Sequence, residues 1–512
     1  MSLTFKKELF PIREDPKKKD PKKKDTNPNS TITNPFPNIV SHKTVTPFAK
    51  ELGEYFKEIL TELARNGVNV FRVNFSHADY SNVESKIKTI REINEENGWN
   101  VAILADLQGP KLRVGVMEEG VELNAGDTFT FTTDKCIGTK EKAYMTYQRF
   151  PKDVKVGENI LVDDGKLMFE VISTNRENEV VVKVIVGGEL KSKKGVNLPN
   201  TNVSLPALTE KDMEDAVFAI GQKVDWIALS FVRTPDDLRM LRDLIAQHSD
   251  YRIPIIAKIE KPEAVKNLDA LIPYCDGLMV ARGDLGVEIP MQEVPLIQKK
   301  IVRRAKRARI PVIIATQMME TMIENAVPTR AEVNDVANSI MDGADAVMLS
   351  GETSVGKHPI KVIQKMSEII MSVEHSKMIK VPHEAPTIRT NRFITKSICH
   401  HAALMANNTD AAAICTLTNS GYTAFQISAW RPRTHVLTFS TDKRILGKLN
   451  LLWGVRAYYY DKDLSTDDTV DDINQIIKEK GFVKSGDIVI NLASMPAEAR
   501  GMVNTLRVSE IK

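Results

Sequence analysis

Apolar residues along this chain fall into short runs that alternate with stretches of helical spacing. Residues 254–260 (PIIAKIE) and 277–284 (GLMVARGD) are two such runs, and residues 262–272 between them have the spacing of a helix. A short apolar run bounded by turn residues is typical of a strand buried on both faces. This unit therefore predicts two parallel, neighbouring strands joined by a helix.

The same rhythm recurs on both sides of this unit. Seven strands are predicted, with starts at Val68, Val101, Asp225, Pro254, Gly277, Pro311 and Ala346. Repeated strand–helix units with apolar strands predict a closed (β/α)8 barrel, the TIM barrel of α/β proteins.

The eighth strand of this barrel is harder to find. It should precede the helix pattern that begins at Pro47, but residues 27–46 contain three prolines and only a short β-like patch at residues 38–45. Proline is poorly tolerated in a central strand. Either residues 36–46 supply a divergent first strand, or that strand is lost and an edge of the barrel is exposed.

A different pattern interrupts the barrel at residues 110–205. Short β-like runs separated by turn residues replace the helical spacing, which predicts an all-β lid domain inserted into the barrel. Alternating helices and strands return at residues 383–512 as a C-terminal α/β domain. The expected domains are a lysine-rich disordered tail at residues 1–35, a barrel at residues 36–109 and 206–382, the β insertion, and this C-terminal domain.

Length, composition and charge narrow the functional classes. A chain of 512 residues exceeds one ordinary domain. The net charge of +3 includes the tail, where PKKKD occurs twice, so the remaining chain is near neutral and nucleic acid is not an expected partner. The apolar runs are too short to span a membrane. Four cysteines without metal-ligand spacing fit a reducing cytosol, so a cytoplasmic location is expected.

Charged side chains lie at the predicted carboxyl ends of the barrel strands, where TIM barrels hold their functional groups. Lys258 and Glu260 should point to the same side of one strand, and Asp284 follows the next strand. Two carboxylates beside a cation suit Mg²⁺ and a phosphoryl group in transfer. The alternative is a surface salt bridge at a strand end. Other polar groups near strand ends are Arg72, Asn74, Ser76, Asp106, Ser230, Thr316, Ser350 and Glu352.

Several long stretches resemble the pyruvate kinase family. They include NVFRVNFSH, IIAKIEKPEAV, GLMVARGDLGVEIP and PTRAEVNDVANSIMDGADAVMLSGETSVGKHP, and they run in order from Asn69 to Ala424. The resemblance implies a barrel with a β lid, a C-terminal regulatory domain and a homotetramer. It also implies the glycolytic transfer of a phosphoryl group from phosphoenolpyruvate to ADP, which gives pyruvate and ATP.

The resemblance also assigns roles around the substrate. Glu260 and Asp284 would hold Mg²⁺, Lys258 would steady charge on the moving phosphoryl group, and Arg72 would contact the same phosphate. The substrate carboxylate would meet the amides of Gly283 and Asp284 and the hydroxyl of Thr316. A water chain near Thr316 would protonate the enolate, with support from Ser350 and Glu352.

The nucleotide side and a monovalent-cation region follow from the same resemblance. Asn74, Arg113 and Lys194 are the implied nucleotide contacts, under the lid. Asn74, Ser76 and Asp106 resemble a K⁺ site, but Leu107 and Lys111 stand where K⁺-dependent members carry Thr and Glu. The chain thus resembles the branch that works without K⁺, in which a tethered ammonium replaces the mobile ion.

The C-terminal domain contains a candidate effector loop. Its residues are Thr416, Thr418, Ser420, Gly421 and Thr423. A strand that runs into a Ser/Thr/Gly turn and a helix start is either an anion site or ordinary helix capping. In the family a comparable loop holds phosphate, but Phe425 stands where a basic side chain is common, so the effector stays open.

Two other functions compete with the kinase. The family's usual first strand and turn are not recognisable, so the chain could be a catalytically impaired scaffold or regulatory subunit. It could also be another barrel enzyme that acts on phosphoenolpyruvate or pyruvate, such as an aldolase-like lyase. The β insertion and the C-terminal domain argue against the lyase.

Overall fold

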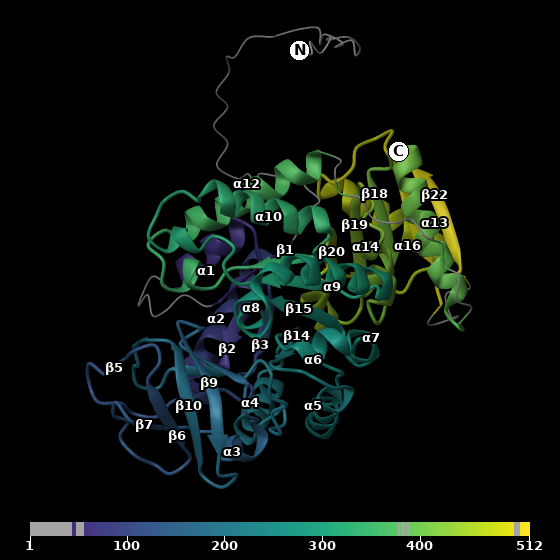
Figure 1. The fold of residues 1–512 in the computed structure, drawn as a ribbon. Coiled ribbons are helices and arrows are strands. Elements are labelled where there is room, and N and C mark those ends of the chain that lie inside the picture. The colour runs from purple at the N-terminus through teal and green to yellow at the C-terminus, as the bar shows by residue number, and fades with distance from the viewer. Residues whose placement is uncertain (1–42, 48–55, 377–378, 380–384, 387–389, 496–501) are drawn as a thin grey trace, which may run out of the picture. The chain divides into compact units, whose positions relative to one another are not determined.

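The computed structural model describes residues 43–47, 56–376, 379, 385–386, 390–495 and 502–512. The expected tail lies outside them. Residues Asn38–Lys512 form one compact unit, which contains a closed barrel and further sheets of seven, two and five strands (Figure 1). Among the described helices, none offers the long apolar stretch that crossing a bilayer requires.

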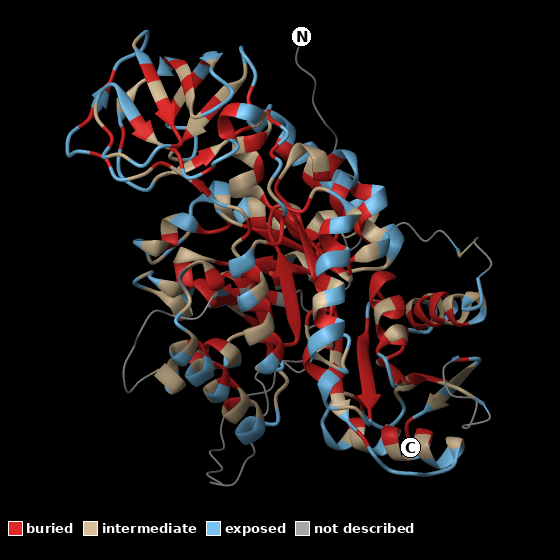
Figure 2. Cartoon of the chain, turned by 90° about the horizontal axis from the view of Figure 1, so that it is seen from below, coloured by how far each residue is buried: buried red, intermediate tan, exposed pale blue. Residues whose placement is uncertain are grey.

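Eight parallel strands close the barrel in the order β1-β17-β16-β15-β14-β13-β3-β2. They are β1 Lys43–Pro47, β2 Val68–Asn74, β3 Ala102–Asp106, β13 Trp226–Leu229, β14 Ile255–Ile259, β15 Gly277–Ala281, β16 Val312–Ala315 and β17 Ala346–Met348. The barrel strands are buried almost throughout, whereas the surrounding helices alternate buried and exposed positions (Figure 2). The predicted TIM barrel is confirmed.

The eighth strand of the barrel is β1. It pairs in parallel with both β17 and β2 and so closes the barrel. It overlaps the β-like patch at residues 43–45, while residues 36–42 lie outside the described part of the chain. Pro47 takes the last strand position, where a missing N–H is tolerated. Thr44 and Thr46 are buried, and the Thr46 hydroxyl bonds that of Thr353. The hypothesis that the first strand is lost is therefore wrong.

Helices follow the barrel strands. The longer ones are α1 Phe56–Arg65, α2 Tyr80–Asn97, α4 Glu210–Gly221, α5 Pro235–His248, α9 Val294–Ala308, α10 Arg330–Asp342 and α12 Pro359–His375. Short ones are α6 Pro262–Lys266, α7 Leu268–Leu271, α8 Arg282–Glu288 and α11 Gly351–Ser354. Local sequence sets several starts: Thr209 and Thr329 each form a capping box with an acidic residue three positions on.

Two local predictions in the barrel need correction. The helix expected at residues 262–272 is present but interrupted at Asn267, which separates α6 from α7 and whose side-chain amide donates to the carbonyl of Arg233. Ser76 does not continue the β2 strand. The Asn74 side chain accepts the Ser76 N–H at 3.2 Å and starts a 3₁₀ turn, η2 Phe75–His77.

The insertion forms its own sheet in the order β4-β12-β8-β9-β10-β6-β7, beside a two-stranded β5–β11 ribbon. The elements are β4 Leu112–Arg113, β5 Glu122–Leu123, β6 Thr128–Thr132, β7 Lys142–Tyr144, α3 Phe150–Asp153, β8 Asn159–Val162, β9 Leu167–Thr174, β10 Glu179–Val186, β11 Gly188–Glu189 and β12 Gly195–Asn197. Alternating apolar residues of these strands build a separate core around Phe129, Phe131 and Phe169. The insertion is therefore an independently packed lid.

The lid joins the barrel at Gly109. Its N–H donates to the buried Asp212 carboxylate at 3.0 Å, which also caps α4. Gly109 has φ +71°, and a Cβ there would lie 2.8 Å from the Phe231 ring. Glycine is required at this junction because no other residue combines that backbone angle with so close a neighbour.

The C-terminal domain has a five-stranded sheet in the order β20-β19-β18-β21-β22. The elements are α13 Phe393–Thr409, β18 Ala413–Leu417, α14 Tyr422–Ala429, β19 His435–Ser440, α15 Arg444–Leu449, β20 Val455–Tyr459, α16 Thr466–Glu479, β21 Ile488–Ala493 and β22 Thr505–Glu510. Four strands are parallel, as the alternating pattern predicts. The antiparallel edge strand β22 was missed because its exposed, mixed residues carry no clear periodicity.

A buried ionic cluster joins this domain to the barrel. Arg431 follows α14 and donates to Asp345 Oδ1 at 2.9 Å and to the Gly343 carbonyl at 2.8 Å. Lys306 of α9 pairs with the same aspartate. Burial would raise the pKa of Asp345, but Arg431 and Lys306 lower it to about 2. Burial, reinforced by the Arg431 charge, lowers the pKa of Lys306 to about 7 despite Asp345.

Lys306 makes the stability of the chain depend on pH. Its pKa in the folded chain is below its ordinary value of 10.5, so the unfolded chain binds more protons from about pH 7 to 10.5. The free energy of unfolding should therefore rise with pH in this window, by up to about 1.4 kcal/mol per unit. Lys306→Met should remove this rise, which denaturant titrations at pH 7, 8 and 9 would measure. Lys299→Met, an exposed lysine of the same helix, is the control. An equal pH slope in wild type and Lys306→Met would contradict the assignment.

Candidate active site

The carboxyl ends of β14 and β3 bring Lys258 against two carboxylates. The Lys258 Nζ lies 2.9 Å from Glu260 Oε1 and 3.2 Å from Asp106 Oδ1. It also donates to the Ser230 hydroxyl at 2.7 Å, from the end of β13. Only 11% of the Lys258 side chain is exposed and 1% of Glu260. The pair is thus buried inside the barrel mouth, and the alternative of a surface salt bridge is wrong.

Arg72 completes this ion cluster from the neighbouring strand. Its Nε lies 2.6 Å from Asp106 Oδ2, so Asp106 sits between Arg72 and Lys258. Burial would raise the pKa of Asp106, but the two cations lower it below its ordinary value. Burial would likewise lower the pKa of Lys258, but Asp106 and Glu260 raise it. Asp106 and Lys258 therefore both stay charged at neutral pH.

Glu260 and Asp284 form the candidate metal site. Burial raises the pKa of the Glu260 carboxyl, and the Asp284 charge adds to that rise although Lys258 opposes it. Glu260 Oε2 accepts the Phe231 N–H at 2.7 Å, and Oε1 lies 2.9 Å from the Lys258 ammonium. Two carboxylates that repel each other are the kind of oxygen ligands that suit a hard divalent cation.

The candidate metal site offers few protein ligands. Within the described ranges, no group of three or more His, Cys, Asp and Glu side chains is placed to hold a metal ion. Glu260 and Asp284 alone fit Mg²⁺ because that ion usually takes one or two protein carboxylates and fills its shell with water and substrate phosphate.

Thr316 and Gly283 meet where β16 and β15 end. The Thr316 Oγ1 accepts the Gly283 N–H at 2.7 Å and donates to the Ala315 carbonyl at 2.6 Å. Thr316 and Gln317 have φ of 70° and 54°, so two successive side-chain-bearing residues are left-handed. Each such residue costs on the order of 1–3 kcal/mol and persists only where its surroundings fix it, as at functional sites.

The structure also shows what holds this loop. Glu352, 2% exposed, accepts the Met319 N–H at 3.2 Å and the Ser350 N–H at 2.6 Å. It therefore contacts the Thr316 loop through backbone amides. Sequence reasoning missed Arg282, whose guanidinium contacts the same loop, and Phe231, whose backbone N–H orients Glu260. The only sequence signal for Arg282 was an arginine at a strand end.

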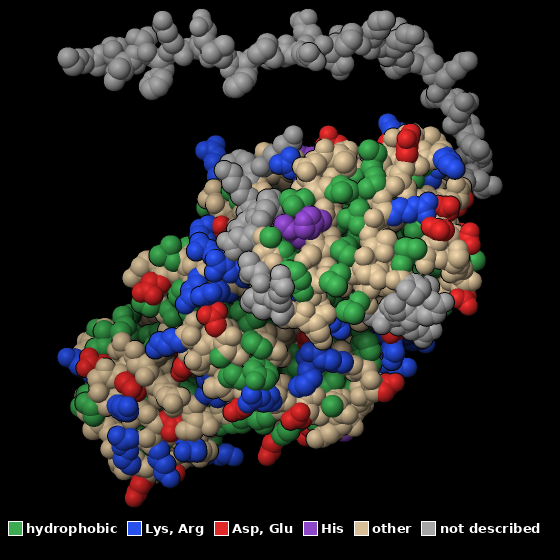
Figure 3. All heavy atoms as spheres, turned by 90° about the vertical axis from the view of Figure 1, so that its right-hand side faces the viewer, with side chains coloured by type: hydrophobic (Ala, Val, Ile, Leu, Met, Phe, Trp, Pro, Cys, Tyr) green, Lys and Arg blue, Asp and Glu red, His purple; other side chains and the backbone are tan. Residues whose placement is uncertain are grey.

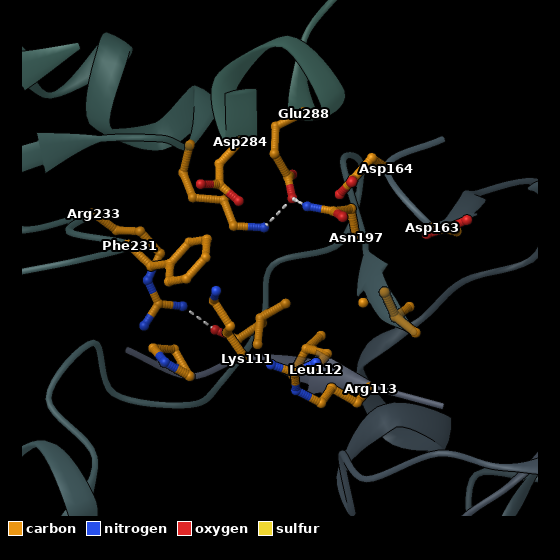
Figure 4. Close-up of a pocket in the computed structure, with 15 residues that line it drawn as sticks. Lys111, Leu112, Arg113, Asp163, Asp164, Asn197, Phe231, Arg233, Asp284 and Glu288 are labelled. Carbon is orange, nitrogen blue, oxygen red and sulfur yellow. Dashed lines mark hydrogen bonds and ion pairs between the residues drawn. The ribbon is translucent and has the colours of Figure 1, made fainter. Parts of the chain in front are cut away.

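A cavity of about 240 Å³ lies between lid and barrel (Figure 4). Asp284, Glu288 and Lys261 line it from the barrel, and Asp163, Asn197 and Arg113 line it from the lid side. Lys261 and the Asn197 amide both contact Glu288, so lid and barrel touch directly at the cavity wall. A ligand in this cavity would contact both domains.

The expected nucleotide residues are only partly brought together. Arg113 lines the cavity and donates to the Lys193 carbonyl at 3.0 Å. Lys194 pairs with Asp163, a cavity residue, at 2.9 Å. Asn74 is exposed at the end of β2, opposite Asp106 in the strand register, and is not among the cavity residues.

The monovalent-cation region is likewise spread over different surroundings. Leu107 is buried in the barrel core, and Ser76 lies in the 3₁₀ turn after β2. Asp106 already contacts two cations. Lys111 is exposed and lines the lid cavity at the Gly109 junction. The Lys111 ammonium therefore lies near the cavity, and the Asp106 carboxylate is already paired with Arg72 and Lys258.

The candidate effector loop joins β18 to α14. The Gly421 N–H donates to the Thr418 hydroxyl at 3.1 Å within the turn, and Gly421, with φ +79°, is the N-cap of α14 without a side-chain capping bond. The Lys448 ammonium from α15 donates to the Ser420 carbonyl at 3.0 Å and lies 5.5 Å from the Phe425 ring. A cation is thus present beside the loop, from a helix that sequence reasoning had not connected with it.

Two family models match the chain. The barrel domain of pyruvate kinase matches residues 42–363, and the α/β domain of pyruvate kinase matches residues 396–509. The first match begins one residue before β1, so the divergent first strand lies within the family's barrel.

Individual relatives agree with the family models. A pyruvate kinase of Bacillus licheniformis is 44% identical over 88% of this chain and 77% of its own length. A pyruvate kinase of Mycobacterium intracellulare is 40% identical over 89% of this chain and 95% of its own length. A crystal structure of a pyruvate kinase from Cryptosporidium parvum superimposes with a TM-score of 0.85 at 32% identity, covering 92% of this chain and 96% of that chain. The chain therefore belongs to the pyruvate kinase family of phosphotransferases.

Proposed function

We propose that this chain catalyses the Mg²⁺-dependent transfer of a phosphoryl group from phosphoenolpyruvate to ADP, which gives pyruvate and ATP in glycolysis. The observation that carries the proposal is the buried Lys258 ammonium, held between Asp106 and Glu260 at the mouth of a pyruvate kinase barrel. Phosphoryl transfer needs positioning and charge neutralisation more than covalent catalysis, and this cluster supplies fixed charge.

Lys258 and Arg72 act on the phosphoryl group. Both cations are held by Asp106, so their positions are set before a substrate arrives. Preorganised charge stabilises the transition state without reorganisation at the moment of reaction. Because the carboxylates raise the pKa of Lys258, its ammonium stays protonated throughout the working pH range.

Glu260 and Asp284 would hold Mg²⁺. When bound, the ion neutralises phosphate charge and orients substrate oxygens. The Phe231 N–H fixes one oxygen of Glu260, so the carboxylate keeps its orientation.

Thr316, Gly283 and Asp284 serve the rest of the substrate. The amides of Gly283 and Asp284 and the Thr316 hydroxyl bind its carboxylate, which replaces Thr316 as the acceptor of the Gly283 N–H. Loss of the phosphoryl group leaves an enolate that gains a proton at carbon. Threonine is a poor acid, so a water chain ordered by Thr316 delivers this proton, with Ser350 and Glu352 behind it.

ADP is placed under the lid. Arg113 and Lys194 approach its phosphates from the lid side, and Asn74, at the end of β2 outside the cavity, is the third proposed contact. The hinge at Gly109 allows the lid to close over the nucleotide and exclude water.

The assembly we propose is a cytoplasmic homotetramer. Hydrophobic side chains are exposed in Figure 3, on the side of the molecule where α13 and β22 lie in Figure 1. Among the described residues of these two elements, Ile394 of α13 is 58% exposed and Val508 of β22 is 48% exposed. Faces of this kind suit contact with another copy of the chain.

The direct experiment is a coupled assay of the purified full-length chain with phosphoenolpyruvate, ADP and MgCl₂. Pyruvate is followed with lactate dehydrogenase, and ATP with hexokinase and glucose-6-phosphate dehydrogenase. We expect equal amounts of both products and no reaction in EDTA. Pyruvate without ATP would favour a different phosphoenolpyruvate enzyme, and no product from a folded chain would favour the impaired scaffold.

Turnover should not require K⁺. Lys111 provides a tethered ammonium beside the cavity, and Asp106 is already paired with two cations. The rate in Na⁺- and K⁺-free buffer should therefore equal the rate with KCl, whereas Lys111→Glu should create a K⁺ dependence. Lys166→Glu, an exposed lid lysine, controls for the change of charge. Turnover that appears only after KCl is added to the wild type would refute this prediction.

A further inference from the structure

Arg282 lies in the middle of the site, and none of the roles above uses it. It directly follows β15 and begins α8, and 12% of its side chain is exposed. Its guanidinium donates to the Thr316 carbonyl at 2.6 Å and to the Ala315 carbonyl at 3.3 Å. Its other terminal nitrogen lies 2.7 Å from Asp335 Oδ1 on α10. The N–H groups of the guanidinium therefore donate to the Thr316 loop and to the Asp335 carboxylate.

The loop that Arg282 contacts is the strained one. Thr316 and Gln317 are both left-handed, and this turn directs the carbonyls of residues 315 and 316 toward the guanidinium. Glu352, in α11, accepts the Met319 N–H of the same loop. A left-handed pair persists only where neighbours over-determine it, and these two ionic side chains are the neighbours that do so.

The contacts also link Thr316 to the start of α8. Arg282 holds the Thr316 backbone, while the N–H of the next residue, Gly283, donates to the Thr316 hydroxyl. The side chain of one residue and the backbone of its neighbour thus hold the same threonine. Thr316, Gly283 and the following Asp284 are fixed relative to one another through this pair of contacts.

A simpler account is that Arg282 and Asp335 form an ordinary structural ion pair. A lysine would satisfy that role, because a single ammonium can meet one carboxylate. The observed geometry uses the planar guanidinium differently, since two of its nitrogens reach adjacent backbone carbonyls while a third nitrogen meets Asp335. Only an arginine provides such a fork.

We propose that Arg282 is a positioning residue that, anchored by Asp335, holds the Thr316 loop in its left-handed conformation and so places the Thr316 hydroxyl for catalysis. This inference rests on the proposed function of Thr316. It predicts that the effect of Arg282 on kcat depends on the presence of the Thr316 hydroxyl.

The test variant is Arg282→Lys, which keeps the charge toward Asp335 and loses the fork. The kcat should fall about 10²-fold, because displacing a catalytic group by about 1 Å costs about that much. In a Thr316→Ala background the same change should cost less than about three-fold, since residues that act as a unit are not additive. Arg242→Lys is the matched control: Arg242 also pairs with a carboxylate, Asp276, and a backbone carbonyl, at the other end of the barrel strands.

A second readout does not depend on activity. Amide hydrogen exchange of residues 312–323, followed by mass spectrometry on the substrate-free full-length chain, should be faster in Arg282→Lys and unchanged in Arg242→Lys. Equal rate losses with and without Thr316, or unchanged exchange of this segment, would overturn the proposal. If the wild type makes no ATP but the exchange responds as expected, the proposed function fails and the loop-holding role of Arg282 stands.

Discussion

Replacing Lys258 with methionine is expected to lower kcat by roughly 10³- to 10⁵-fold, the range lost when a cation that stabilises a phosphoryl transition state is removed. Lys258 is buried, permanently charged and fixed by Asp106 and Glu260. A water molecule cannot replace it, because water carries no positive charge. Steady-state kinetics with saturating phosphoenolpyruvate, ADP and Mg²⁺ would measure the loss.

The Lys258→Met variant could lose activity because it unfolds or because it lacks the catalytic charge, and these two causes must be distinguished. Without Lys258, Glu260 keeps a buried carboxyl that lacks its cation, while Asp106 keeps Arg72. Lys306→Met is the matched control, because Lys306 is also a buried lysine paired with a carboxylate, at the contact between the barrel and the C-terminal domain. Thermal unfolding should show both variants folded, and only Lys258→Met should be inactive. More than about a tenth of wild-type turnover in Lys258→Met would be incompatible with a central role for this cation.

Asp284→Asn should raise the Mg²⁺ concentration needed for half-maximal activity by at least about 100-fold, because outer partners of a metal alone change affinity by about 10–100-fold and Asp284 would be a direct ligand. The same change removes a negative charge that raises the pKa of Glu260. The metal-free variant should therefore be at least as stable as the wild type at neutral pH, where Glu260 is otherwise destabilised in its charged form.

Melting temperature with and without MgCl₂ separates these two effects. The wild type should gain stability from Mg²⁺ through binding to the folded state, and Asp284→Asn should gain little. Asp269→Asn, an exposed carboxylate that pairs with Arg304, is the control and should respond as the wild type does. If Asp284→Asn showed the full Mg²⁺-induced rise, Asp284 would not be a ligand.

The barrel could be predicted because its strands are buried on both faces. Such strands read as short apolar runs, and their starts were identified to within about two residues. The first strand was the exception. Lys43–Pro47 has only five residues, two of them threonines that face buried partners, so its composition does not look like a buried strand.

The sequence predicts those residues of the candidate site whose placement follows from the alternation of side chains along a strand. Lys258 and Glu260 share a side because of alternation, and Asp284 follows the adjacent strand. Arg282 could not be assigned in this way, because its role depends on the left-handed turn of another strand's loop. The same limit applies to Lys448, which reaches the effector loop from α15 through tertiary packing. Contacts of this kind leave no local pattern in the sequence.

The most direct test of phosphoryl transfer is a ³¹P NMR time course of the full-length chain with phosphoenolpyruvate, ADP and MgCl₂. The proposed function predicts that the phosphoenolpyruvate resonance is replaced, one for one, by the γ-phosphate resonance of ATP. Release of inorganic phosphate instead, or an unchanged spectrum from a folded chain, would contradict it.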